Sequence, residues 1–231
     1  MDFPVKNNLP DLFQAVVSND ELDKRELWFQ KRLGKFTSSE LSRLMTYEDN
    51  ISELPKGAIT YIEEKALEIL TGGKSVKNFT NDSMERGNEK ELEAIAVFEE
   101  MFGVKCYATG EDQEFIELCS YFGGTPDGLI AEEDMIEVKC PDCKTHLFRI
   151  RNIKSQEDFK KHEKDYYWQI QGNFLSSGRK RCFFIDYDDR FTKKEQQLFV
   201  IEIHRNENDI QKAKTRLNMA EKYKQNLLNI W

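Results

Sequence analysis

The stretch at residues 125–140, TPDGLIAEEDMIEVKC, constrains the fold more than any other part of the chain. Two short apolar runs, at 127–131 and 135–140, flank an acidic loop, and this pattern predicts a β-hairpin. Side chains alternate across a strand, so Glu137 and Lys139 point to the same face, roughly 6.6 Å apart along the strand. That spacing is wide for a direct ion pair and favours a site in which something lies between the two charges.

The first arm of the hairpin brings a second carboxylate. Pro126 and Gly128 bracket Asp127 and predict a turn just before the strand. Asp127 would then lie opposite Glu137 and Lys139, and two neighbouring carboxylates repel each other unless a cation separates them. Mg²⁺ prefers such oxygen ligands, and a nearby lysine can polarise its water. Because carboxylates and lysines are common, the spacing alone also fits a hairpin with ordinary surface charges.

The rest of the chain predicts both helices and strands. Apolar periodicity predicts helices over 18–33, 37–45, 57–71, 81–102, 165–177 and from 206 onward. Strands are predicted at 104–109, 114–118, 127–131, 135–140, 181–187 and 198–204. This order favours a single α/β domain, residues 1–231, with a central mixed β-sheet flanked by α-helices.

Charge is distributed unevenly along the sequence. The net charge is −8, which alone argues against binding to nucleic acid. However, residues 85–137 hold fifteen acidic against three basic residues, and residues 144–194 hold thirteen basic against seven acidic residues. An acidic region beside a basic one suits a metal-dependent enzyme that acts on a polyanion. Two solvated surface patches would give the same counts.

Other features bear on location and on alternative chemistry. Five cysteines, no signal-peptide pattern and no long apolar run favour a reduced cytoplasmic setting without a membrane. Cys140 and Cys143 have the C-x₂-C spacing of a zinc or iron–sulfur site, but such a site needs about four ligands. Because the other cysteines form no second pair, Cys140 is interpreted as a core residue at a strand end. The three histidines are scattered and lack a nucleophile motif.

Several motifs in order resemble one nuclease family. TPDGLIAEEDMIEVKCP resembles the PD-(D/E)xK motif in the form found in phage lambda exonuclease and YqaJ-type viral recombinase nucleases. Four further segments are similar to elements of that family: LWFQKRLGKFTSSE (27–40), RGNEKELEA (86–94), YYWQIQGNF (166–174), and DYDDRF followed by LFVIEIHRNE (186–207). The resemblance runs from about residue 26 to 210, and it implies a restriction-endonuclease-like core.

The resemblance assigns metal-binding roles residue by residue. Asp127 and Glu137 would be metal ligands, with the Val138 carbonyl as a third. Glu91 would support a second metal or its waters. Glu117 stands ten residues before the catalytic aspartate, where the family has Asp, and would belong to the metal shell. The implied cofactor is Mg²⁺ in a two-metal site, for which Mn²⁺ can substitute.

The resemblance also assigns the remaining site residues. Lys139 would position the attacking water, and Gln169 would contact the nucleophile or the scissile phosphate. A pocket for a 5′-phosphate would be formed by Arg32, Ser39 and Thr125, with Trp28 close by. Thr125 replaces the serine of the family and keeps its hydroxyl. For Arg32, one helical turn after Trp28, a cation–π pair with that ring is the alternative.

The function implied by the resemblance is specific. It is a 5′→3′ exonuclease that digests one strand of linear double-stranded DNA from 5′-phosphorylated ends. The 3′ single strand that remains would serve phage-type recombination by strand annealing. A homotrimer, a single-strand annealing protein as partner, and a phage or prophage origin in a bacterial host are implied as well. The alternatives are a non-catalytic DNA-binding or assembly subunit on the same fold, and a structure-specific endonuclease.

Overall fold

The computed structural model describes residues 24–75 and 82–230. Contacts divide the chain into two units, residues 1–31 and 32–231. In the first unit, the described residues belong to helix α1 (Lys24–Arg32), where Trp28 packs edge-on against Phe29 with ring centroids 5.2 Å apart. The predicted start of this helix, at 18–23, lies outside the described residues. Gly34 follows the helix with φ +69°, a conformation that favours glycine.

The second unit contains two mixed sheets. The four-stranded sheet has the order β4-β5-β6-β7, in which β5 and β6 are parallel and the other pairs antiparallel. Its strands are β4 (Gly128–Ile130), β5 (Asp134–Lys139), β6 (Arg181–Tyr187) and β7 (Leu198–His204). The three-stranded sheet has the order β1-β3-β2, built from β1 (Phe36–Thr37), β3 (Phe122–Gly124) and β2 (Ile116–Cys119). The predicted α/β class is confirmed, with two mixed sheets in place of one.

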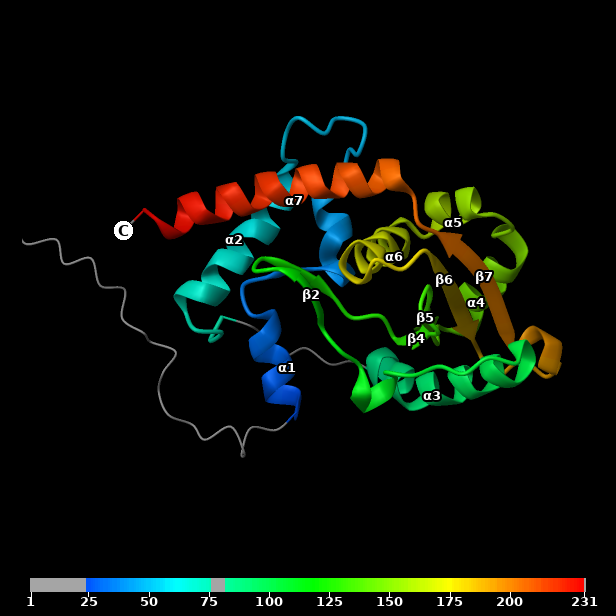
Figure 1. Ribbon diagram of the computed structural model, residues 1–231. Coiled ribbons are helices and arrows are strands. Elements are labelled where there is room, and N and C mark those ends of the chain that lie inside the picture. Colours follow the sequence, from blue (N-terminus) through cyan, green and yellow to red (C-terminus); the bar gives the residue numbers. More distant parts are fainter. Residues whose placement is uncertain (1–23, 76–81, 231) are drawn as a thin grey trace, which may run out of the picture. The chain divides into compact units, whose positions relative to one another are not determined.

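Helices account for most of the remaining chain (Figure 1). The α-helices of this unit are α2 (Lys56–Leu70), α3 (Asp82–Phe102), α4 (Cys143–Asn152), α5 (Gln156–His162), α6 (Lys164–Ser177) and α7 (Glu207–Leu228). Short 3₁₀ helices are η1 (Ser38–Leu44), η2 (Gly110–Asp112) and η3 (Lys194–Gln196). The helix predicted at 37–45 is a 3₁₀ helix, η1. It begins at Ser38 because Thr37 belongs to strand β1.

The four-stranded sheet is covered on both faces. Met135 and Phe184 belong to a core cluster that includes residues of η1, α2, α6 and α7. Ile136 and Phe183, one position away on each strand, belong to a second cluster with residues of α3. Figure 1 shows α3 and α7 on opposite sides of these strands. Because side chains alternate along β5, Glu137 and Lys139 share the face of Met135, toward α6.

One predicted strand is largely absent from the structure, and two helices were not predicted. The strand predicted at 104–109 is reduced to one bridge between Tyr107 and Leu129. Ala108 there has φ +53° and Gly110 has φ +57°, so the extended backbone cannot continue. Helices α4 and α5 were not predicted, although Asp142 and Ser155 cap them with side-chain hydrogen bonds. Cys140 does lie at a strand end and packs against the second core cluster, as predicted.

Candidate active site

The β4–β5 hairpin brings the three motif residues together. Asp127 directly precedes β4, and its Oδ2 accepts a hydrogen bond from the Val138 backbone N–H, 2.7 Å away. Lys139 Nζ lies 2.6 Å from Glu137 Oε1 and 3.6 Å from Asp127 Oδ2. The sequence interpretation of a gap between Glu137 and Lys139 is wrong, because the flexible lysine side chain bends back to form the ion pair. Lys139 Nζ also donates to the Val138 carbonyl at 3.0 Å, so this oxygen is within reach of the ammonium group.

Helix α6 supplies two amides to the same carboxylate. Gln169 Nε2 donates to Glu137 Oε1 at 2.5 Å, and Asn173 Nδ2 donates to Oε2 at 3.4 Å. Residues four apart on a helix share one face, so both amides come from the side of α6 that covers β5. Glu137 is 0% exposed, and its two oxygens are held by one ammonium and two amides. Sequence reasoning found Gln169 but missed Asn173.

Helix α3 brings a third carboxylate. Gln113 Nε2 donates to Glu91 Oε1 at 2.8 Å and to the Asp127 carbonyl at 3.5 Å, and so links α3 to the start of β4. Gln113 was not predicted from the sequence. Its segment, GEDQEF, gives no signal beyond acidity, and the side chain reaches the site only through the tertiary fold.

The electrostatics of the three carboxylates are unbalanced. Burial, together with the charge of Asp127, raises the pKa of Glu91 to about 7 and that of Glu137 to about 8. Burial would lower the pKa of Lys139, but the charges of Glu137 and Asp127 outweigh it and raise this pKa. Three acidic groups therefore share one ammonium group. The excess negative charge is a condition that a bound cation would relieve.

The donor atoms suit a hard divalent cation such as Mg²⁺. They are carboxylate oxygens with a backbone carbonyl nearby, and Mg²⁺ is usually held by one or two carboxylates while keeping several waters. Within residues 24–75 and 82–230, no three His, Cys, Asp or Glu side chains form a group that could hold a metal ion by themselves.

Two of the residues predicted to form a phosphate pocket are in contact. Arg32 Nη1 donates to the Thr125 hydroxyl at 3.1 Å, and the guanidinium lies 5.5 Å from the centre of the Phe115 ring. Ser39 is exposed, and its hydroxyl pairs with that of Thr37 at 3.2 Å. Trp28 lies in the first unit, so its role beside Arg32 stays a prediction.

Glu117 lies on β2, where its Oε2 accepts from Lys35 Nζ at 2.6 Å. In the described part of the chain, no hydrogen bond or ion pair joins Glu117 to Asp127 or Glu137. Its place in a metal shell therefore stays a prediction without structural support. The prediction came from sequence position alone, whereas the side chain of this exposed residue reaches Lys35.

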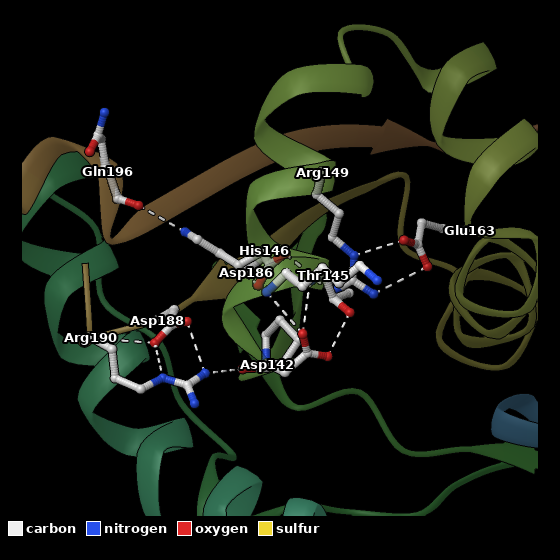
Figure 2. Close-up of polar contacts among 11 residues, drawn as sticks. Asp142, Thr145, His146, Arg149, Glu163, Asp186, Asp188, Arg190 and Gln196 are labelled. Atoms are coloured by element: carbon white, nitrogen blue, oxygen red, sulfur yellow. Dashed lines mark hydrogen bonds and ion pairs between the residues drawn. The ribbon is translucent and has the colours of Figure 1, made fainter.

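A second group of buried charges lies on the neighbouring strand (Figure 2). Asp186 on β6 pairs in register with Lys139 on β5. Its Oδ1 lies 3.0 Å from His146 Nδ1, and its Oδ2 accepts from Arg149 Nη1 at 3.1 Å. Arg149 also donates two hydrogen bonds to Glu163, at 2.8 and 3.1 Å. This network ties α4, the residue before α6, and β6 together.

One aromatic ring joins the two groups of charges. Lys139 Nζ lies 5.2 Å from the centre of the Tyr166 ring, and the Arg149 guanidinium lies 5.4 Å from the same centre. Tyr166 stands one helical turn before Gln169 on α6. The second charge network therefore helps to fix the part of α6 that faces the catalytic candidates.

None of the helices in the described ranges combines the length and apolar character needed to cross a membrane.

Comparisons with known proteins identify a family and similar structures. A family model described as "YqaJ-like viral recombinase domain" matches residues 27–180. The alkaline exonuclease LHK-Exo from Laribacter hongkongensis has a similar structure, with a TM-score of 0.73 and 28% sequence identity over 88% of this chain and 94% of that chain. The structure of LHK-Exo in complex with dAMP gives the same values.

A second exonuclease shows the same fold at lower sequence identity. A phage related exonuclease from Haemophilus somnus 129PT gives a TM-score of 0.66 at 20% identity, over 84% of this chain and 95% of that chain. At this identity the likeness concerns the fold alone. A search among curated proteins finds no match.

Proposed function

Because this chain belongs to the family of YqaJ-like viral recombinase domains, we propose that it is an exonuclease that hydrolyses one strand of linear double-stranded DNA. The observation that carries the proposal is the convergence of Asp127, Glu137 and Lys139 under α6. These three residues converge in a fold similar to that of the alkaline exonuclease LHK-Exo. The complex of LHK-Exo with dAMP supports a nucleotide as the ligand of such a site.

The residues of this chain suggest a division of work. Asp127, Glu137 and the Val138 carbonyl would hold Mg²⁺, which Mn²⁺ could replace, with Glu91 supporting a second ion. When bound, the metal supplies an activated water and offsets charge on the phosphate. The Lys139 ammonium lies beside the same carboxylates and can donate to the attacking water or to a phosphoryl oxygen.

The amides hold the acids in place. Gln169 donates to Glu137 and fixes the orientation of its carboxylate, and Gln113 does the same for Glu91. Glu137 itself is fully buried, which keeps bulk water away from this carboxylate. Fixed donors and acceptors need no reorganisation during the reaction, which is the main way in which such sites lower a barrier.

The proposed direction of digestion depends on the phosphate pocket that contains Arg32 and Thr125. Arg32 and Thr125 lie together and offer a guanidinium fork and a hydroxyl to a terminal 5′-phosphate. If the end is held there, every cut leaves a new 5′-phosphate for the same pocket, so digestion runs 5′→3′ and a 3′ single strand remains. We also propose a phage or prophage origin in a bacterial host, which the description of the family as viral supports. A homotrimer and a single-strand annealing protein as partner complete the proposal.

One experiment separates the proposed activity from its alternatives. The protein is incubated with Mg²⁺ and either linear duplex, labelled at its 5′ or 3′ ends, or closed circular duplex. We expect early release of the 5′ label as a mononucleotide, with circles left intact. Cutting of circles would identify an endonuclease, and DNA binding without digestion would identify a non-catalytic subunit. Light scattering tests the trimer, which would have three times the chain mass of 27.2 kDa.

A further inference from the structure

Two cations lie beside the aromatic ring of Phe115. The Arg32 guanidinium is 5.5 Å from the ring centre, and Lys35 Nζ is 5.7 Å from it. Both cations come from one tight turn, in which the Lys35 backbone N–H donates to the Arg32 carbonyl at 3.0 Å. Gly34, between them, has φ +69°, and its N–H donates to Glu68 at 2.9 Å. The turn therefore fixes the backbone from which both side chains extend.

The ring itself is held in place by close packing. A Cβ atom added at Gly123 on β3 would lie 2.4 Å from Phe115 Cζ, so only glycine leaves room for the ring at this position. Phe115 directly precedes β2, which pairs with β3. The ring is therefore a fixed neighbour of both cations, and one of them, Arg32, also donates to the Thr125 hydroxyl.

Glu117 is the solvent-accessible partner of Lys35. Its side chain is 46% exposed, against 17% for Lys35, so water competes for the carboxylate and limits what the ion pair contributes to stability. A terminal phosphate carries a charge of about −1.5 to −2 and three acceptor oxygens, against one charge on a carboxylate. Because it has more charge and more acceptors, a phosphate close to Arg32 would displace Glu117 from Lys35 at small cost.

We propose that Lys35 is a second phosphate-binding cation beside Arg32, held by Glu117 until a 5′-phosphorylated DNA end arrives. The inference rests on the proposed function of the pocket formed by Arg32 and Thr125. It makes Lys35 a specificity-determining residue for phosphorylated ends. It also gives Glu117 a different role from a metal ligand, that of a carboxylate that competes with the phosphate for Lys35.

The test measures binding without hydrolysis. Fluorescence anisotropy compares one blunt duplex with either 5′-phosphate or 5′-hydroxyl ends, in buffer free of divalent metal. We expect wild type to prefer the phosphorylated duplex, and Lys35→Ala to lower this preference about tenfold, the low end for loss of a charge-assisted contact. Lys35→Arg should retain the preference. If wild type binds both duplexes equally, or if Lys35→Ala keeps the full preference, the inference is wrong.

Glu117→Gln and a matched lysine variant complete the test. Glu117→Gln should bind phosphorylated ends at least as tightly as wild type in the same metal-free buffer. Weaker binding of phosphorylated ends by this variant, at an unchanged melting temperature, would overturn the role given to Glu117. Lys160→Ala is the control, because Lys160 also pairs with a carboxylate (Asp209, 2.8 Å) and lies over a ring (Tyr167, 5.0 Å). It should leave the preference unchanged.

The design separates the inference from the proposed function. A wild type that digests no DNA, yet prefers phosphorylated ends in a manner that depends on Lys35, would refute the exonuclease and keep the inference. If wild type digests linear duplex but its preference for phosphorylated ends is insensitive to Lys35→Ala, the exonuclease proposal is kept and the inference is refuted.

Discussion

Strands β5 and β6 run parallel and place Lys139 beside Asp186, yet the charges around these two residues are arranged differently. Around Lys139, the carboxylates of Glu91, Asp127 and Glu137 depend on one ammonium group and on amides. Around Asp186, each carboxylate oxygen has its own cationic or imidazole partner, and the remaining nitrogens of Arg149 bind Glu163 (Figure 2).

The pKa directions express this contrast. In the first region the pKa of Glu91 and of Glu137 is raised, so folding disfavours their charged forms. In the second, burial would lower the pKa of Arg149, but Glu163 and Asp186 outweigh it and raise the pKa, so folding favours the charge. An unbalanced group retains affinity for a ligand, whereas a balanced group serves as a scaffold. Buried charge alone therefore does not identify a site, but uncompensated charge of one sign does.

The largest expected effect comes from the unbalanced region. Asp127→Asn or Glu137→Gln should lower the rate of DNA hydrolysis at least about a hundredfold, the scale for loss of one preorganised electrostatic contact. The melting temperature should stay equal or rise, because each change removes a repelling charge. Hydrolysis rates and thermal unfolding are measured on the same samples. Asp134→Asn, on the same strand but paired with the partly exposed Arg181, is the control and should keep wild-type activity. Full activity in either site variant would contradict the assignment.

Substitutions in the balanced region around Asp186 should lower stability much more than activity. Arg149→Met leaves Asp186 and Glu163 without their guanidinium, and breaking a buried pair in this way costs about 3–5 kcal/mol. For a chain of this size, the melting temperature should fall by about 6–20 °C. Hydrolysis at low temperature, normalised to folded protein, should change far less than in Glu137→Gln.

A matched arginine tests whether burial causes this loss. Arg181 pairs with Asp134 at 2.6 Å and lies over the Phe183 ring, but its side chain is 38% exposed. Arg181→Met should cost less than about 1 kcal/mol. Equal destabilisation by the two substitutions would show that the network around Asp186 has no special weight.

The smallest effect concerns pH. Burial would lower the pKa of His146, but hydrogen bonds to Asp186 and to the Gln196 carbonyl outweigh it and raise the pKa above its ordinary value. A raised histidine pKa stabilises the fold below the unfolded value of about 6.5, and this stability is lost as pH rises through the folded value. The advantage of wild type over His146→Gln, about 1 kcal/mol or 2–4 °C, should therefore shrink on the alkaline side.

Melting curves over a pH series measure this difference. His204→Gln serves as the control, because the His204 side chain is 61% exposed and lies 3.7 Å from Glu202. Its difference from wild type should be small at every pH. An advantage of wild type over His146→Gln that grows with rising pH would show that the imidazole is neutral in the folded protein.

The sequence predicted the elements whose pattern is local. The strands at 181–187 and 198–204 match β6 and β7 residue for residue, because each is a run of β-branched and aromatic residues. Asp127, Glu137 and Lys139 were found because a single hairpin holds all three. Strands β1 and β3 were missed, since each has only two or three residues, and β1 pairs with a segment far away in sequence.

Contacts between distant segments escaped prediction. Gln113 and Asn173 are ordinary polar residues in sequence, and each becomes part of the site only when α3 or α6 packs onto the sheet. Lys35 and Glu117 are separated by 82 positions, and no periodicity connects them. The Glu137–Lys139 ion pair was misjudged because strand spacing fixes where side chains start but not where a long lysine ends.

The parallel pairing of β5 with β6 also has a consequence for synthesis of the chain. Parallel strands need a long crossover, and here the whole segment between Lys139 and Arg181 must be made before the two strands can meet. At about 5–20 residues per second, roughly 2–8 s pass during which the ribosome has completed the acidic hairpin without its lid, α6. The emerging chain therefore carries every acidic candidate before the site can close, and its competence to act is acquired only once β6 and α6 have been made.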